Sequence, residues 1–340
     1  MSNTFGTLFR ATTWGESHSR ALGAVIDGCP AGLSLSEKDI ESYIKKTSVF
    51  FNFSTSRREE NKIEILSGVY KNRTLGTPIS LITFNSCADS SEYLKLEGVA
   101  RPSHAEYAYY KKYGIYDPRG GGRASGRECI ARHMAAAVAD KIIKLTDIKI
   151  SAAIIELAGM PARTKKEMEL AVKKAEKIKE EKDSSGGVFE ITLTGVPAGM
   201  GSPVFGKLSS QISSCLFSVG GIKSVEIGAG KDIAAMKGSR ANDSLYFDGG
   251  GTLKYASNNS GGISGGISTG APIVVRAAVK PTPSIYQKQA TIDFYKNVNR
   301  EIELKGRFDS NFTPRAMAAA VSMIRIMLAD NLLQMNFIKF

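Results

Sequence analysis

One stretch of the chain, residues 117–128, constrains the fold and the ligand more than any other. Three consecutive glycines lie there among arginines, in the order Asp-Pro-Arg-Gly-Gly-Gly-Arg-Ala-Ser-Gly-Arg-Glu. Glycine lets backbone N–H groups approach a ligand, and arginine binds phosphate or carboxylate through paired hydrogen bonds. An alanine-rich helix is predicted to begin at about residue 128, so its positive end adds to the same field. We interpret this stretch as an anion-binding loop rather than a solvated glycine turn.

The chain as a whole is basic. Its 340 residues include 45 Lys and Arg against 33 Asp and Glu, a formal net charge of +12. A basic surface attracts anions, which include nucleic acids and small phosphorylated molecules. The lysines of residues 165–182 alternate with glutamates, as is typical of a solvated helix face, and no platform of stacking aromatics is visible. We therefore expect a small anionic ligand and no nucleic-acid partner.

The cysteines and the hydropathy pattern indicate the compartment. The four cysteines are scattered without a CxxC pair, so neither a disulfide framework nor a metal site is expected. The N-terminal residues have no apolar core of the signal-peptide kind, and no run of 18 apolar residues occurs. These features predict a cytoplasmic protein without membrane association.

Hydrophobic periodicity predicts a mixture of helices and strands. Strands are expected at 21–27, 62–69, 79–84, 149–157, 189–196, 224–227 and 273–279, and helices at 36–46, 128–145, 165–182, 204–217 and 314–333. The strands fit hairpins better than parallel crossovers, so the predicted fold class is α+β. We expect a single domain over residues 1–340, with a mobile loop at about 45–56.

Two of the three histidines are candidates for acid–base chemistry. His18 and His104 lie in turn-like segments, where functional groups are commonly mounted, and neither occupies an apolar helix face. Histidine gives or takes a proton near neutral pH, so the pair suits a reaction with two proton movements. His133 falls inside the alanine-rich helix, and we interpret it as a helix residue without a chemical role.

Three further segments belong with the glycine-arginine loop. Residues 258–270 are rich in glycine, residues 280–285 place a lysine and two hydroxyls in a proline-stiffened stretch, and residues 306–309 pair an arginine with an aspartate. Each segment alone fits ordinary turn chemistry. Together with residues 117–128 they predict several loops that converge on a multiply anionic ligand.

At this point the sequence resembles the chorismate synthase family, in order and along nearly the whole chain. The motifs are GESHSRALGAVIDGCPAG (15–32), RREENKIEILSGVYKNRTLGTPI (57–79), RPSHAEYAYYKKYGIYDPRGGGRASGRE (101–128), SVEIGAG (224–230), NNSGGISGGISTGAPIVVR (258–276), KPTPSI (280–285) and KGRFDS (305–310). The resemblance implies a β-α-β sandwich core with glycine-rich active-site loops, usually as a homotetramer. It also implies 5-enolpyruvylshikimate 3-phosphate as substrate and an anti-1,4-elimination of phosphate that yields chorismate, the last step of the shikimate pathway, with reduced FMN as cofactor.

The resemblance implies roles for particular residues. His104 would protonate the leaving phosphate, His18 would hold a proton on the reduced flavin, and Asp309 would lie near the flavin N5. The implied substrate-binding residues are Ser17, Lys46, Arg101 and Arg127. The implied FMN-binding residues are Arg123, Ala124, Ser125, Gly220, Gly221, Gly265, Lys280, Pro281, Thr282, Pro283, Ser284 and Arg307.

The chain also departs from the family pattern. Lys46 and Asn52 hold positions at which the family usually has arginines linked with NADPH and substrate. We therefore expect NADPH to act only indirectly, through a separate flavin reductase. Other departures fall at Ser19, Ala124, Gly126, Gly220, Gly221, Phe308 and Val321. Both candidate histidines and Asp309 are retained, so an active enzyme is expected; the alternative is a flavin-binding enzyme on the same scaffold with an altered substrate.

Overall fold

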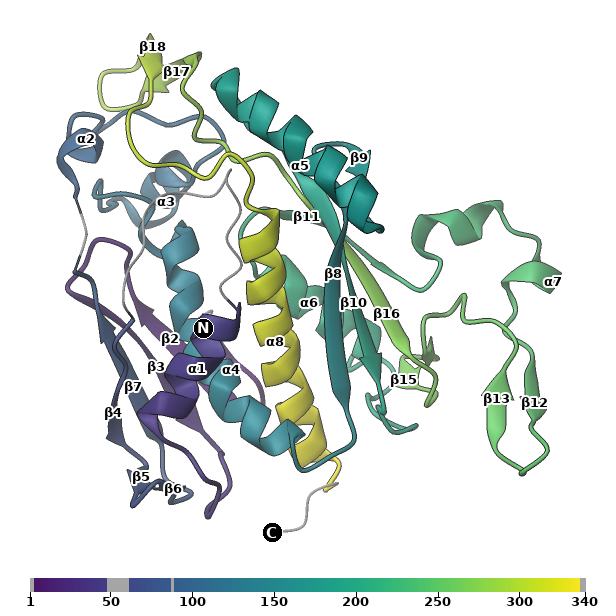
Figure 1. Cartoon of the computed structure of the whole chain (residues 1–340). Coiled ribbons are helices and arrows are strands. Elements are labelled where there is room, and N and C mark those ends of the chain that lie inside the picture. Colours follow the sequence, from purple (N-terminus) through teal and green to yellow (C-terminus); the bar gives the residue numbers. More distant parts are fainter. Residues whose placement is uncertain (1–2, 48–60, 87–88, 337–340) are drawn as a thin grey trace.

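The protein is described by a computed structural model that covers residues 3–47, 61–86 and 89–336. Most of the predicted loop at 45–56, including Asn52, therefore lies outside the described residues. Two five-stranded sheets face each other with helices between them, as Figure 1 shows. This arrangement confirms the predicted α+β class and the β-α-β sandwich.

The first sheet carries the N-terminal half of the site. Its strands, in the order β1-β2-β3-β7-β4, are β1 (Thr4–Phe5), β2 (Arg10–Gly15), β3 (Ala21–Asp27), β7 (Ile79–Phe84) and β4 (Glu64–Ser67). All their pairings are antiparallel. Leu22, Ala24 and Ile26 of β3 are fully buried, which explains the predicted apolar run. The β2–β3 hairpin turn holds the segment from Glu16 to Arg20, so it places His18 at one end of the sheet.

The second sheet closes the other side of the sandwich. Its strands, in the order β11-β16-β10-β8-β9, are β11 (Ile222–Ile227), β16 (Ile273–Val279), β10 (Gly187–Thr194), β8 (Lys149–Leu157) and β9 (Met160–Pro161). Alternate residues of β16, from Ile273 to Val279, are buried. Lys280 follows β16 directly, so this strand delivers the 280–284 segment to the same end of the molecule.

Four helices fill the space between the sheets, namely α1 (Glu37–Thr47), α4 (Cys129–Ile143), α6 (Leu208–Phe217) and α8 (Thr313–Gln334). The alanines of α4 are almost all fully buried, because small side chains let α4 and α8 approach closely. By length and composition alone α8 could cross a membrane, but most of it is buried inside this fold. It is therefore explained as a core helix.

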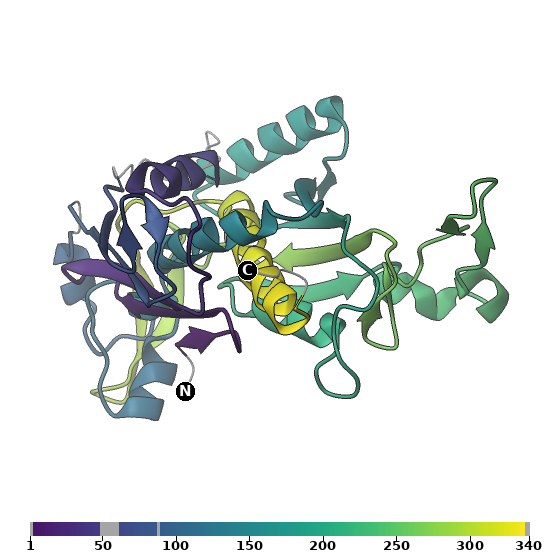
Figure 2. The same cartoon turned by 90° about the horizontal axis from the view of Figure 1, so that it is seen from below.

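The remaining elements lie around the sandwich. The helix α5 (Lys165–Glu180) packs on β8 and β9, and Thr164 and Glu167 form a capping box at its N-terminus. An arm with α7 (Gly238–Ala241), β12 (Leu245–Phe247) and β13 (Leu253–Tyr255) projects to one side, as Figure 2 shows. The other short elements are β5 (Val69–Tyr70), β6 (Arg73–Thr74), α2 (Ser91–Leu94), α3 (Glu106–Tyr113), β14 (Ile263–Ser264), β15 (Ile267–Ser268), β17 (Lys288–Asp293), β18 (Val298–Glu303) and the 3-10 turns at Gly122–Ala124, Gly126–Glu128 and Gly230–Ala235.

Candidate active site

A cleft of about 2440 Å³ opens where the ends of both sheets meet the N-terminal ends of α4 and α8. Most residues that the sequence singled out line it, although they come from segments far apart in the chain. These residues are Ser17, His18, Arg101, His104, Arg123, Ala124, Ser125, Arg127, Gly220, Gly221, Lys280, Pro281, Thr282, Pro283, Ser284, Arg307 and Asp309. The loops at 117–128, 280–285 and 306–309 therefore converge as predicted, whereas no residue of the glycine-rich segment 258–270 lines the cleft.

Two predicted residues do not line this cleft. Gly265 lies in the β14–β15 turn, outside the cleft. The carbonyl oxygen of its neighbour Gly266 accepts a hydrogen bond from the backbone N–H of Leu208 at 2.8 Å. Lys46 lies near the end of α1, where its neighbours Lys45 and Thr47 line the cleft instead. Consecutive helical residues point about 100° apart, so the lysine that faces the cleft is the preceding one.

His104 is held by hydrogen bonds at both ring nitrogens. Its Nδ1 lies 2.9 Å from the Pro102 carbonyl oxygen and its Nε2 lies 2.9 Å from Ser284 Oγ. A carbonyl oxygen only accepts, so Nδ1 carries the proton and Nε2 accepts from the serine hydroxyl. Burial, together with the positive charges of Arg101 and Lys280, lowers the pKa of His104 to about 4. The imidazole is therefore neutral in the ligand-free protein at neutral pH.

His18 lies in the turn between β2 and β3, and its ring packs against Gly120, the first of the three consecutive glycines. Its Nδ1 is 2.8 Å from Ser90 Oγ, and its ring meets the Tyr93 ring edge-to-face at 5.2 Å. Gly120 has a φ of +73°, and a Cβ there would lie 2.8 Å from the His18 ring. Only glycine fits this position, both for its backbone conformation and for its contact with the histidine.

Arg101 forms a buried ion pair beside His104. Its guanidinium group contacts the Glu106 carboxylate, and the two side chains are only 6% and 9% exposed. The guanidinium also lies over the Tyr93 ring, 5.0 Å from its centroid, so Tyr93 contacts both Arg101 and His18. Lys280 donates to the Ser103 carbonyl oxygen at 3.1 Å, which adds a second cation near His104.

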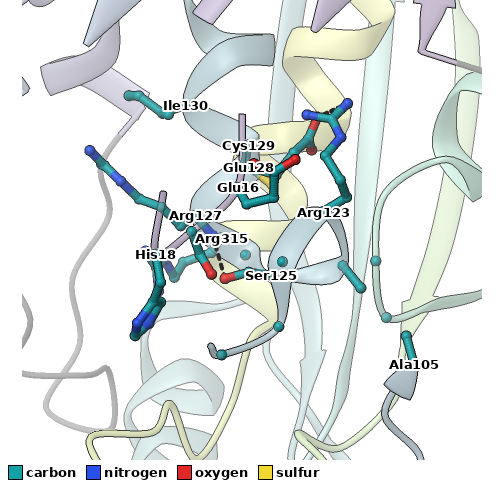
Figure 3. Close-up of a pocket in the computed structure, with 18 of the residues that line it drawn as sticks. Glu16, His18, Ala105, Arg123, Ser125, Arg127, Glu128, Cys129, Ile130 and Arg315 are labelled. Atoms are coloured by element: carbon teal, nitrogen blue, oxygen red, sulfur yellow. Dashed lines mark hydrogen bonds and ion pairs between the residues drawn. The ribbon is translucent and has the colours of Figure 1, made fainter. Parts of the chain in front are cut away.

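Two arginines of the glycine loop bind acceptors within the protein. Arg119 binds its neighbour Asp117, with 2.8 Å between Nη2 and Oδ2. Arg123 donates to the carbonyl oxygens of Thr13 at 3.1 Å and Gly15 at 3.2 Å, so its guanidinium faces the protein backbone. In Figure 3, Arg123 and Glu128 lie side by side, apart from His18. Both side chains therefore order the loop, and because Arg123 also lines the cleft, its contact with FMN stays a prediction.

Three cleft residues were missed or given no role from the sequence. Arg315, in the first turn of α8, binds the Asp309 carboxylate with 2.8 Å between Nη1 and Oδ2. His133 also lines the cleft, with Nδ1 2.8 Å from Ser322 Oγ. Glu128 accepts from Thr13 and Arg132. Arg315 and His133 lie a few residues beyond recognised motifs, and Glu128 is the last residue of one, but none of the motifs indicated a role for them.

The donors and the shape of the cleft fit a phosphorylated flavin. Ser17 Oγ and Thr282 Oγ1 are buried and have no hydrogen-bond partner within the described part of the chain, so both hydroxyls are available to a ligand. A Cβ at Gly122 or Gly220 would meet nothing within 4 Å, which leaves backbone accessible there. Aromatic rings that could cover an isoalloxazine also line the cleft, from Trp14, Phe308 and Phe312.

The low pKa values of two histidines make the protein's stability depend on pH. Burial lowers the pKa of His133 to about 4, and the positive charges of Arg315 and Arg132 contribute to a smaller extent. The pKa of His104 is also lowered to about 4, mainly by burial. The unfolded chain, with histidine near 6.5, binds more protons than the folded chain between about pH 4 and 6.5. The free energy of unfolding should therefore rise with pH through this window and fall on acidification.

Urea unfolding at about pH 4.5 and about pH 7 measures this difference. The double variant His104→Gln/His133→Asn keeps hydrogen-bonding groups but has no imidazole to titrate, so it should show a smaller change between the two pH values. An undiminished change in the variant would assign the pH dependence to other groups.

Comparison with known proteins agrees with this geometry. The profile of the family described as "Chorismate synthase" matches residues 9–333. A protein of Methanococcoides burtonii named chorismate synthase is 44% identical over 99% of this chain and 97% of its own length. One of Methanocaldococcus jannaschii with the same name is 42% identical over 99% and 98%. A solved structure titled "Crystal Structure of Chorismate Synthase" aligns with a TM-score of 0.75 and 28% identity, covering 97% of this chain and 93% of its own.

The family match and the named relatives define a lyase of the class that acts on phosphorylated substrates, and its fold is the β-α-β sandwich of the solved structure. More particularly, the chain belongs to the chorismate synthase family, whose members serve aromatic biosynthesis.

Proposed function

We propose that this enzyme eliminates phosphate from 5-enolpyruvylshikimate 3-phosphate in an anti-1,4 sense to give chorismate, the last step of the shikimate pathway, with reduced FMN as cofactor. The observation that carries the proposal is His104, which is half-buried, doubly hydrogen-bonded and flanked by Arg101 and Lys280 in the cleft. A departing phosphate needs a proton and neutralisation of its charge, and this cluster offers both.

His104 would deliver its proton from Nε2, because Nδ1–H remains bound to the Pro102 carbonyl oxygen. The ligand-free imidazole is neutral, whereas a phosphate dianion beside it would favour the charged form and raise its pKa. Substrate binding would therefore be accompanied by proton uptake at His104. Ser284, whose hydroxyl lies against Nε2, would yield its place to a phosphate oxygen or share the proton with it.

FMN would be held by the hydroxyls and backbone of the 280–284 and 123–125 segments, by the Gly220–Gly221 turn and by Arg307. When bound, the reduced flavin would supply an electron-rich ring beside the substrate for an elimination without net redox change. His18 would hold a proton at Nε2, since Ser90 engages Nδ1. Arg315 would keep the Asp309 carboxylate oriented toward the same site.

The proposal extends to the setting of the enzyme. We expect a single domain with a mobile loop at about 45–56, a homotetramer, and a cytoplasmic location. Ser17, Arg101 and Arg127 would bind substrate within the cleft. Lys46 would contact the substrate only if the 45–56 loop brought it to the cleft. Gly265 would contact FMN only if its turn rearranged, or in the site of a neighbouring subunit of the tetramer.

The test is an anaerobic assay with purified protein, chemically reduced FMN and the phosphorylated enol ether. Stoichiometric chorismate and inorganic phosphate are expected. NADPH in place of the chemical reductant should support turnover only when a separate flavin reductase is added. Tight flavin binding without either product would favour the alternative of an altered substrate, and absence of both binding and product would remove the flavin proposal.

A further inference from the structure

We propose that Glu128 is a positioning residue that fixes the His18 turn and the Gly220–Gly221 turn relative to each other across the cleft; this inference rests on the proposed function for its ligand. Glu128 immediately precedes α4 and is 4% exposed. Its two carboxylate oxygens accept hydrogen bonds from residues on different sides of the cleft. Glu128 therefore connects two turns that belong to different sheets.

The first connection runs to the end of β2. Thr13 Oγ1 donates to Glu128 Oε1 at 3.0 Å and accepts from Arg123 Nη2 at 2.7 Å. Arg123 in turn donates to the carbonyl oxygens of Thr13 and Gly15, and its Nη2 lies 3.7 Å from Glu128 Oε1. Gly15 opens the turn that carries His18. Glu128 Oε1 therefore holds the residues at which that turn begins against the glycine-arginine loop.

The second connection runs to the end of α6. Glu128 Oε2 accepts from Arg132 Nε at 2.8 Å. Arg132 donates from Nη1 to Ser218 Oγ at 2.7 Å and from Nη2 to the Ser218 carbonyl oxygen at 3.0 Å. Ser218 is separated from the Gly220–Gly221 turn by one residue, and the Gly221 carbonyl oxygen accepts from the Lys280 backbone N–H at 2.9 Å. Glu128 Oε2 therefore fixes the Gly220–Gly221 turn, which is hydrogen-bonded to the start of the 280–284 segment.

The charge of Glu128 matters as well as its shape. Arg123 and Arg132 both lie against this one buried carboxylate, so its negative charge helps to hold both guanidinium groups in place. Glutamine would keep the size of the side chain but would present an N–H₂ group to one of two donors, Thr13 or Arg132. Facing Arg132, this group breaks the second connection; facing Thr13, it reverses the hydrogen bond, because a hydroxyl can also accept. In either orientation the negative charge that holds Arg123 and Arg132 is lost, and the two turns would shift relative to each other.

The experiment compares Glu128→Gln with wild type in the full-length protein. Titration with FMN, followed by flavin fluorescence, should give an affinity about tenfold weaker, because small displacements of binding groups have large effects. Hydrogen exchange without ligand should accelerate both in residues 13–18 and in residues 218–221. A carboxylate that only supported α4 would instead show faster exchange within the helix and an unchanged affinity, which overturns the proposal.

Asp140→Asn is the matched control. Asp140 lies within α4, the helix that Glu128 precedes, and it also binds two cations, Arg325 at 3.0 Å and Lys144 at 2.8 Å, but it does not line the cleft. Its replacement should lower stability without changing FMN affinity or exchange in the two turns.

A double-mutant cycle with Ser218→Ala tests the second connection. Both changes interrupt the path from Glu128 through Arg132 to Ser218, so the combined loss of FMN affinity should be smaller than the product of the separate losses. A simple product would show that the residues act independently and would overturn the inference. If wild type bound no FMN, the proposed function would fail, while hydrogen exchange in the two turns would still decide the role of Glu128.

Discussion

Replacing His104 by alanine is expected to lower kcat by about 10²–10⁴-fold, the usual contribution of a positioned proton donor. FMN affinity should change by less than about threefold, because the replaced ring contributes a proton and not the main flavin contacts. The measurement is anaerobic turnover with reduced FMN beside a flavin titration. The pH dependence of kcat that belongs to His104 should disappear in the variant.

His104→Gln separates proton transfer from hydrogen bonding. A glutamine amide can still bind Ser284 but has no proton to deliver near neutral pH, so this variant should remain as slow as the alanine variant. Turnover within about threefold of wild type in either variant would remove His104 as the proton donor.

Arg101→Met is expected to lower the free energy of unfolding by about 3–5 kcal/mol, because it leaves the Glu106 carboxylate buried without its partner. Activity should be lost at the same time, since Arg101 also lies beside His104. Urea unfolding and turnover measure the two effects separately.

The two effects can be told apart with Arg101→Met/Glu106→Gln. Replacement of both members of a buried ion pair by neutral groups of similar volume is often close to neutral in stability. The double variant should therefore recover most of the lost stability but none of the activity. Recovery of both would show that Arg101 serves the fold alone.

Much of the architecture was predictable, because it rests on local patterns. β3, β7, β8 and β16 begin and end at the residues that the alternation of apolar side chains indicated. α5 follows its capping box, and α8 follows the apolar run after residue 313. α3 was not predicted, because its tyrosines and lysines form no apolar stripe; its aromatic rings instead pack on Phe294 from the β17–β18 hairpin.

The sequence predicted which residues belong to the site better than it predicted how they are arranged. The sequence by itself determined the family, the two histidines and the loops that line the cleft, because motifs of several residues are legible without coordinates. Only the tertiary structure decided which groups face the ligand. Arg119 and Arg123 bind protein acceptors, whereas Arg315 orients Asp309. The direction of a guanidinium group depends on the acceptors brought near it by distant strands and helices, and for Arg123 those come from β2, more than a hundred residues away in the chain. The same strand brings the Thr13 hydroxyl that donates to Glu128.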